Sequence, residues 1–126
     1  MQPIDKGSQR FGSDRRLLQR AEFQRVFEAG QRTSGRYLTI IAAPSQHRAS
    51  RLGIVASRKF GNAVHRNRAK RLIREVFRRT DSRETPGLDL IVIPRRELLD
   101  AAYAHFEHDF RATLKRCAGR VSRVAG

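Results

Sequence analysis

The residues best suited to bind a charged ligand are gathered in one segment, residues 58–79, which reads RKFGNAVHRNRAKRLIREVFRR. The segment contains nine Lys or Arg residues and one acid, Glu75, so it contributes +8 of the chain's formal net charge of +15. Arg side chains present planar, forked donors that match the oxygens of a phosphate group. This concentration of Arg indicates a phosphate-binding surface, and a basic face that meets only solvent is the plainer alternative.

The spacing of the same segment is that of an amphipathic helix over about residues 63–79. At 100° per residue, the apolar side chains fall within an arc of about 140°, and they are Ala69, Leu72, Ile73, Val76 and Phe77. The opposite side, within about 60°, carries Asn67, Arg71, Arg74 and Arg78, with Arg68 and Lys70 beside them. Surface helices usually mix charges of both signs and gain pairs four residues apart. A stripe of like charge costs stability, so it predicts a polyanionic partner.

A second candidate for binding chemistry is the aromatic pair Phe23 and Phe27, four residues apart in a predicted helix over about residues 20–29. Residues at this spacing share one face of a helix. Aromatic rings so placed usually belong to a core, but exposed rings stack on nucleobases of any sequence. Tyr37, at the start of a predicted strand, has the same two interpretations.

Length and composition fit a single globular domain with an anionic partner. The chain has 126 residues, 39% of them hydrophobic, which is enough for one core. Of its 27 basic residues, 23 are Arg and four are Lys. A field of this sign attracts polyanions, so nucleic acid is the leading class of partner and an anionic membrane surface is the second.

Other classes of function lack their signatures in this sequence. No apolar run is long enough for a membrane span, and residues 1–12 lack the apolar stretch of a signal peptide. Cys117 is the single cysteine, which excludes an internal disulfide and fits a reducing cytoplasm. His105 and His108 are three residues apart but belong to no H-E-x-x-H pattern, so no metal site is expected in the protein.

The elements that must position these residues follow from periodicity and turn residues. Strands are predicted over residues 37–43, 51–57 and 88–94, the first two antiparallel, and a last helix over about 101–117. Together with the helices over 20–29 and 63–79, these give the order α-β-β-α-β-α, an α+β domain over residues 16–117 with helices on a small sheet. Residues 1–15 and 118–126 are predicted to be flexible tails.

The stretch GNAVHRNRAKRLIREVFR closely resembles the signature of the bacterial ribonuclease P protein subunit. The flanking order LLxxxEFQRVF, LGIVAS followed by RK, and LIVIP is similar too, so that the resemblance covers about residues 10–117. It implies a small mixed sheet like domain 2 of ribosomal protein S5, with a left-handed βαβ crossover that carries the Arg-rich helix. It also implies a cytoplasmic ribonucleoprotein that removes the 5′ leader of precursor transfer RNA, in which the RNA performs the chemistry with Mg²⁺.

The resemblance assigns roles to matched positions of this chain. Facing the catalytic RNA would be Arg58, Arg66, Asn67, Arg68, Lys70, Arg71, Arg74 and Arg78. Lining the cleft for the single-stranded leader would be Phe23, Phe27, Tyr37 and Lys59. The family often has paired lysines after the second strand, where this chain has Arg58 and Lys59.

The resemblance also fixes the expected partners. They are one catalytic RNA for each protein and precursor transfer RNA, with no membrane and no obligate protein partner. The alternative is a ribosomal or general RNA-binding protein of similar fold. A protein that cuts RNA with its own groups needs a positioned general acid and base, but the acids of this chain are scattered. We therefore expect no catalytic residue here and no cleavage by the protein alone.

Overall fold

The computed structural model describes residues 20–45, 50–80 and 87–125, and the predicted N-terminal tail lies outside these ranges. The elements are α2 (Arg20–Ala29), β1 (Gln31–Ser34), β2 (Leu38–Pro44), β3 (Arg51–Ile54), α3 (Ala63–Arg79), β4 (Leu88–Pro94), the 3-10 helix η2 (Arg96–Asp100) and α4 (Tyr103–Ala125). The predicted α+β class and the helices over 20–29 and 63–79 are confirmed. Within the described ranges, no helix combines the length and apolar character needed to span a membrane.

The four strands form one mixed sheet in the order β1-β2-β4-β3. Strand β4 pairs antiparallel with β2, with Val92 opposite Ile40, and parallel with β3, with Ile91 opposite Gly53. The strands predicted over 37–43 and 51–57 therefore run in opposite directions as expected, but β4 lies between them. A parallel pair needs a crossover connection, and α3 provides it. The left hand of this crossover and the S5-like arrangement stay predictions.

Strand β1 was absent from the predicted order, because its sequence QRTS lacks apolar alternation and only Thr33 is buried. It pairs antiparallel with β2 at the edge of the sheet. Two arginines of α4 bind its backbone: Arg116 donates to the carbonyl of Ser34 at 3.0 Å, and Arg120 donates to the carbonyl of Arg32 at 2.8 Å. These bonds occupy carbonyl groups that an edge strand would otherwise leave open to pairing.

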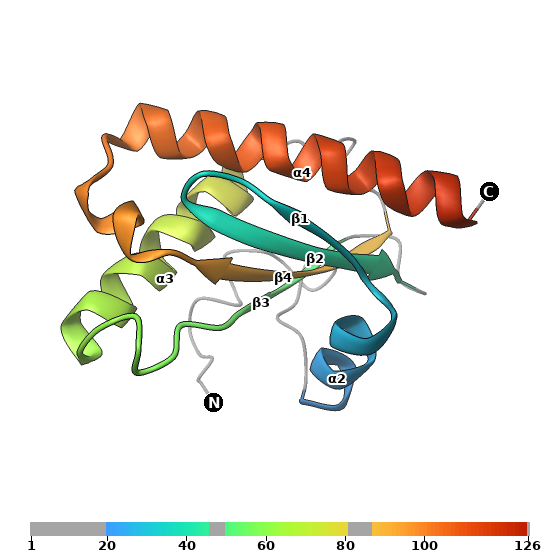
Figure 1. Cartoon of the computed structure of the whole chain (residues 1–126), viewed down its shortest axis with the longest axis horizontal. Helices are drawn as coiled ribbons and strands as arrows, with labels where there is room; N and C mark the ends of the chain where they lie inside the picture. The colour runs from blue at the N-terminus through green and yellow to red at the C-terminus, as the bar shows by residue number, and fades with distance from the viewer. Residues whose placement is uncertain (1–19, 46–49, 81–86, 126) are drawn as a thin grey trace.

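Helices cover both faces of the sheet, as Figure 1 shows with α4 on one side and α2 on the other. Leu38, Ile40 and Ala42 of β2 face the larger core, which includes side chains of α3 and α4. Ile41 and Ala43 face the opposite side, where they pack with Val26 of α2 and Ile91 of β4. The period of two residues along β2 thus divides its side chains between two cores.

Helix α4 extends to Ala125, so the predicted end at Cys117 and the flexible tail from 118 are wrong for residues 118–125. Gly119 is a weak helix former, but burial continues beyond it. Cys117 and Val121 are buried in the same core as the predicted stripe of Phe106, Phe110 and Leu114. Packing against the sheet therefore sustains the helix where local preference does not.

A buried ionic cluster fixes α2 to the sheet. The carboxylate of Asp89 in β4 is fully buried, and it accepts hydrogen bonds from Nε and Nη2 of Arg51 at 2.9 and 2.8 Å. Arg25 of α2 also pairs with Asp89, and Glu22 of α2 pairs with Arg51 at 2.5 Å. The hydrogen bond to Asp89 is the main cause that raises the pKa of Arg51, so this guanidinium stays charged. The cluster joins α2, β3 and β4 at one end of the sheet.

Replacing Asp89 by Asn should lower the free energy of unfolding by about 3 kcal/mol, because two arginines would lose the carboxylate that balances their charge in a buried place. Urea denaturation of the two proteins measures this difference. The matched control is Glu75→Gln, which removes a carboxylate whose partners are surface arginines of α3 and should have a much smaller effect. Equal losses in the two variants would show that the buried cluster does not hold α2.

Candidate nucleic-acid interface

Helix α3 begins and ends with capping groups that its own sequence supplies. The side chain of Asn62 accepts a hydrogen bond from the backbone N–H of His65 at 2.9 Å, which satisfies one of the free donors of the first turn. Gly61 precedes it with φ of 159°, a conformation that residues with a side chain rarely adopt. At the other end, the hydroxyl of Thr80 donates to the carbonyl of Val76 at 2.8 Å. The Arg-rich helix is therefore bounded as predicted, over residues 63–79.

The apolar side of α3 holds the helix against the sheet and α4. Ala69, Ile73, Val76 and Phe77 are fully buried, and Leu72 packs against them half-buried. This confirms the predicted buried arc. The opposite side of the helix must consequently face away from the core.

The residues predicted to face the catalytic RNA divide into two groups by exposure. Five are exposed, namely Arg58, Asn67, Arg68, Arg71 and Arg78. Three are half-buried, namely Arg66, Lys70 and Arg74. Arg66 turns back toward the start of its helix, where its Nη1 donates to the carbonyl of Gly61 at 2.8 Å. We call the exposed set Asn67, Arg68, Arg71 and Arg78 the α3 crest.

Glu75 reduces the positive charge at one end of the α3 crest. Its carboxylate pairs with Arg78 at 2.5 Å and with Arg79 at 2.8 Å. The hydrogen bond from Arg78 is the main cause that lowers the pKa of Glu75, so this carboxylate is a weak proton acceptor. Arg71 lies one turn before Glu75. Its side chain makes no hydrogen bond or ion pair within the described part of the chain, so its guanidinium is open to a ligand.

Arg58 and Lys59 lie in the turn that joins β3 to α3, and both are exposed. The buried ring of Phe60 anchors this turn, and its backbone N–H donates to the carbonyl of Ser57 at 2.9 Å. Since β3 and β4 are parallel, the segments that follow them leave from the same end of the sheet. Arg95, the exposed residue after β4, therefore lies at the same end as Arg58 and Lys59.

The two aromatic residues of α2 are placed differently. Phe23 is half-buried and packs on β3, where a Cβ atom at Gly53 would overlap its ring. Phe27 is 41% exposed, and Val26 between them is the fully buried residue of the helix. On a helical wheel Phe23 and Phe27 occupy one flank of α2, and Glu22 and Arg25 occupy the other. The ionic cluster thus lies beside one flank and the aromatic rings project from the other.

Beside the aromatic flank, the sheet face under α2 remains partly uncovered. Val55, after β3, and Ile93, on β4, are half-buried against the smaller core. Nη2 of Arg95 lies 3.4 Å from the hydroxyl of Thr39, which places this arginine at the border of the same face. We call Phe23, Phe27, Val55, Ile93 and Arg95 the open sheet surface: two aromatic rings, an aliphatic floor and a cation.

Val55, Ile93 and Arg95 were not among the residues predicted from the sequence. The run LDLIVIP is apolar on both faces of β4, so its pattern does not indicate which side chains a helix leaves uncovered. The parallel pairing of β3 with β4 brings the three residues together, and that pairing carries no local signal.

Tyr37 does not lie with Phe23 and Phe27. Its ring is 7% exposed and packs in the larger core under α4, on the other face of the sheet. Its backbone N–H donates to the carboxylate of Asp109 in α4 at 2.9 Å, and the guanidinium of Arg36 lies 5.3 Å from the centre of the ring. The predicted grouping of Tyr37 in the aromatic cleft is therefore wrong, because the ring points to the opposite face of the sheet.

No metal centre is formed by the described residues, which contain no group of three or more His, Cys, Asp or Glu side chains suited to hold an ion. His105 and His108 both project from the exposed side of α4. Burial raises the pKa of the Cys117 thiol, so this side chain remains a neutral core group. The chemistry available at the two surfaces is binding: phosphate contacts by Arg and stacking by aromatic rings.

Three comparisons with known proteins point to one family. A family model described as Ribonuclease P matches residues 11–118. The ribonuclease P protein component of Thermotoga maritima is 36% identical over 112 residues, which are 88% of this chain and 92% of that protein. The solved RNase P protein from Thermotoga maritima superposes with a TM-score of 0.74 at 34% identity, over 81% of this chain and 97% of that one. A Staphylococcus aureus RNase P protein mutant with defective mRNA degradation activity gives a TM-score of 0.74 at 30% identity, over 90% and 96% of the two chains.

The exposures of the aromatic pair predict unequal effects on stability. Phe23→Ala should lower the free energy of unfolding by about 2 kcal/mol, because the ring packs on β3. Phe27→Ala should lower it by less than about 1 kcal/mol, since much of that ring already contacts water. Thermal or urea unfolding of both variants tests this order, and a larger loss for Phe27→Ala would assign Phe27 to the core.

Proposed function

Because this chain belongs to the ribonuclease P protein family, we propose that it binds the catalytic RNA of that enzyme through α3 and the 5′ leader of precursor transfer RNA through the open sheet surface. Membership of the family carries with it a role in transfer-RNA processing. The observation that supports the binding roles best is the α3 crest: exposed Arg and Asn side chains on a helix whose other side is fully buried.

For the catalytic RNA, the crest offers contacts of the kind that read a phosphate backbone. Arg71 and Arg68 are exposed and make no ion pair within the described residues, so no internal partner has to be displaced when RNA binds. Asn67, one turn before Arg71, adds donors and an acceptor that suit ribose and phosphate oxygens. Arg58 and Lys59 extend the positive surface to the turn before the helix.

For the leader, the open sheet surface offers contacts that tolerate any base. Phe27 presents an exposed ring, Phe23 is a half-buried ring beside it, and Val55 and Ile93 form an apolar floor. Arg95 borders the same face and supplies a cation for the backbone of a single strand. Stacking together with a nearby cation is how single-stranded RNA is bound without sequence preference.

In the proposed complex the RNA performs the chemical step with Mg²⁺ that it binds. One protein binds each RNA. The only acid in the Arg-rich helix is Glu75. Its pKa is lowered by Arg78, which makes it a poor general base. The alternative of a ribosomal or general RNA-binding protein lacks the support that the family match gives to this proposal.

Arg71→Ala should weaken binding to the catalytic RNA and make the dependence of log Kd on log salt shallower by about 0.7–0.9, the value of one phosphate contact. The measurement is a filter-binding titration of the RNA at several salt concentrations. Arg123→Ala, at the far end of α4, removes the same charge from an exposed position and should leave the slope nearly unchanged. Arg74→Ala is a second test, but Arg74 is half-buried, so its fold must be checked first. An unchanged slope for Arg71→Ala would remove the crest from the interface.

The reconstituted ribonucleoprotein should bind precursor transfer RNA more tightly than mature transfer RNA. Phe27→Ala should reduce the preference by about 1–3 kcal/mol, because one stacked base is lost. Equal affinities of the wild-type complex for the two RNAs would contradict the leader surface.

Cleavage assays complete this experiment. The complex with Mg²⁺ should release the leader, and the protein without RNA should not. Since one solved relative is a Staphylococcus aureus RNase P protein mutant with defective mRNA degradation activity, an mRNA fragment is included as a second substrate for the protein alone. Leader release by protein free of RNA would contradict an RNA-based chemical step.

A further inference from the structure

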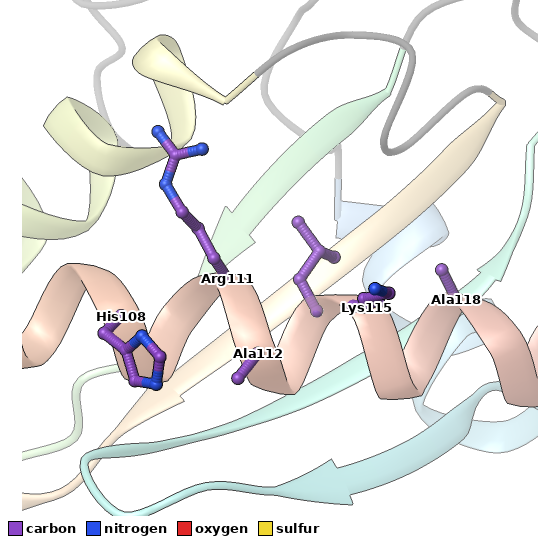
Figure 2. Close-up of a pocket in the computed structure, with 6 residues that line it drawn as sticks. His108, Arg111, Ala112, Lys115 and Ala118 are labelled. Atoms are coloured by element: carbon purple, nitrogen blue, oxygen red, sulfur yellow. The ribbon is translucent and has the colours of Figure 1, made fainter.

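Helix α4 carries a hollow of about 430 Å³ on the side that adjoins the end of α3. Its lining residues are His108, Arg111, Ala112, Leu114, Lys115 and Ala118. Figure 2 shows the labelled members of this set along the helix, with the Arg111 side chain extending toward α3. We call this set the α4 hollow.

The lining combines nitrogen bases with an apolar floor. Arg111 and Lys115 are cations, His108 adds an imidazole, and the described lining residues include no acid. Ala112, Ala118 and the buried Leu114 supply the apolar part. From His108 to Lys115 the basic groups extend about 10 Å along the helix axis. A ligand that suits this lining has an anionic group and an uncharged, partly apolar body, as a nucleotide has.

Arg111 connects the α4 hollow to the Arg-rich helix. Its Nη2 lies 3.3 Å from the carboxylate of Glu107 and 3.5 Å from the backbone carbonyl of Arg79, the last residue of α3. The guanidinium of Arg79 lies 6.0 Å from the ring centre of Tyr103, near the start of α4. The end of α3 therefore contacts α4 directly, and the α4 hollow adjoins the Arg-rich helix.

We propose that the α4 hollow is a second contact site for the catalytic RNA, which places a nucleotide there with its phosphate against Arg111 and Lys115 and its sugar or base on Ala112 and Ala118. This inference rests on the function proposed above, because it assumes that the same RNA already lies on the α3 crest. The contact of Arg111 with the last residue of α3 places the hollow beside the helix that carries the α3 crest, which favours this RNA. The leader surface lies on the opposite face of the sheet, beside α2.

Lys115→Ala tests the proposal with little risk to the fold, since Lys115 is exposed and its side chain makes no hydrogen bond or ion pair with the described residues. The control is again Arg123→Ala, which removes one positive charge from an exposed position of the same helix outside the hollow. Circular dichroism melting confirms that both variants fold. Each protein is then titrated with the catalytic RNA at several salt concentrations, and the complexes are compared by hydroxyl-radical footprinting.

Lys115→Ala should make the salt dependence shallower by about one phosphate contact, and Arg123→Ala should change it little. Lys115→Ala should also expose a discrete RNA segment, distinct from the segment exposed by Arg71→Ala. Equal effects of Lys115→Ala and Arg123→Ala, or no effect of either, would overturn the site and leave the α3 crest intact. If Lys115→Ala changed only the binding of precursor transfer RNA, or only the self-association of the protein, the hollow would have another partner. That result would also overturn the proposed site. If the proposed RNA-binding function were wrong, the wild-type protein itself would not bind the catalytic RNA, which is a different result from those above.

Discussion

The arrangement of this domain depends on the burial of β4 on both of its faces. Its residues alternate between two cores, with Leu90 and Val92 under α3 and α4 and Ile91 under α2. A strand that is apolar on both sides needs cover on both sides, which requires helices above and below the sheet (Figure 1). The parallel pairing of β4 with β3 also requires a crossover, and the crossover is the Arg-rich helix. One central strand therefore sets the positions of both candidate RNA surfaces.

The short helix α2 covers only part of its face, and this incomplete cover leaves the open sheet surface, the candidate site for a single strand. The buried cluster around Asp89 holds one flank of α2 through Arg25 and, by way of Arg51, through Glu22. Toward the other end of β4, Ile93 stays half-buried and Arg95 is exposed. The aromatic rings project over this uncovered part. A structural ion cluster and a candidate single-strand surface thus lie at opposite flanks of one helix.

The accuracy of the sequence predictions followed the range of the interactions involved. Helix α3, its buried stripe and the exposure of Asn67, Arg71 and Arg78 were predicted correctly, since each depends on spacing within 17 residues, whereas Arg74 of the predicted outer stripe is half-buried. Strand β1 and the last two turns of α4 were not predicted: QRTS has no pattern of its own and is held by β2 and by Arg116 and Arg120, while burial of Val121 against distant strands sustains α4 beyond Gly119. Tyr37 was assigned to the wrong surface, because strand periodicity divides side chains between the two faces of the sheet but does not indicate which helix covers each face.

By itself, the sequence indicated an anionic partner and predicted the helix through which we propose that it binds. Net charge and the preference for Arg are properties of composition, and the two opposed stripes of α3 follow from the helical repeat. Neither depends on contacts between residues that are far apart in the sequence. The tertiary structure decided the rest. It separated Tyr37 from Phe23, joined Val55, Ile93 and Arg95 into one surface, and placed Arg111 of α4 against the end of α3. These groupings depend on strand order and on which face each helix covers, and both are set by long-range burial that no local pattern encodes.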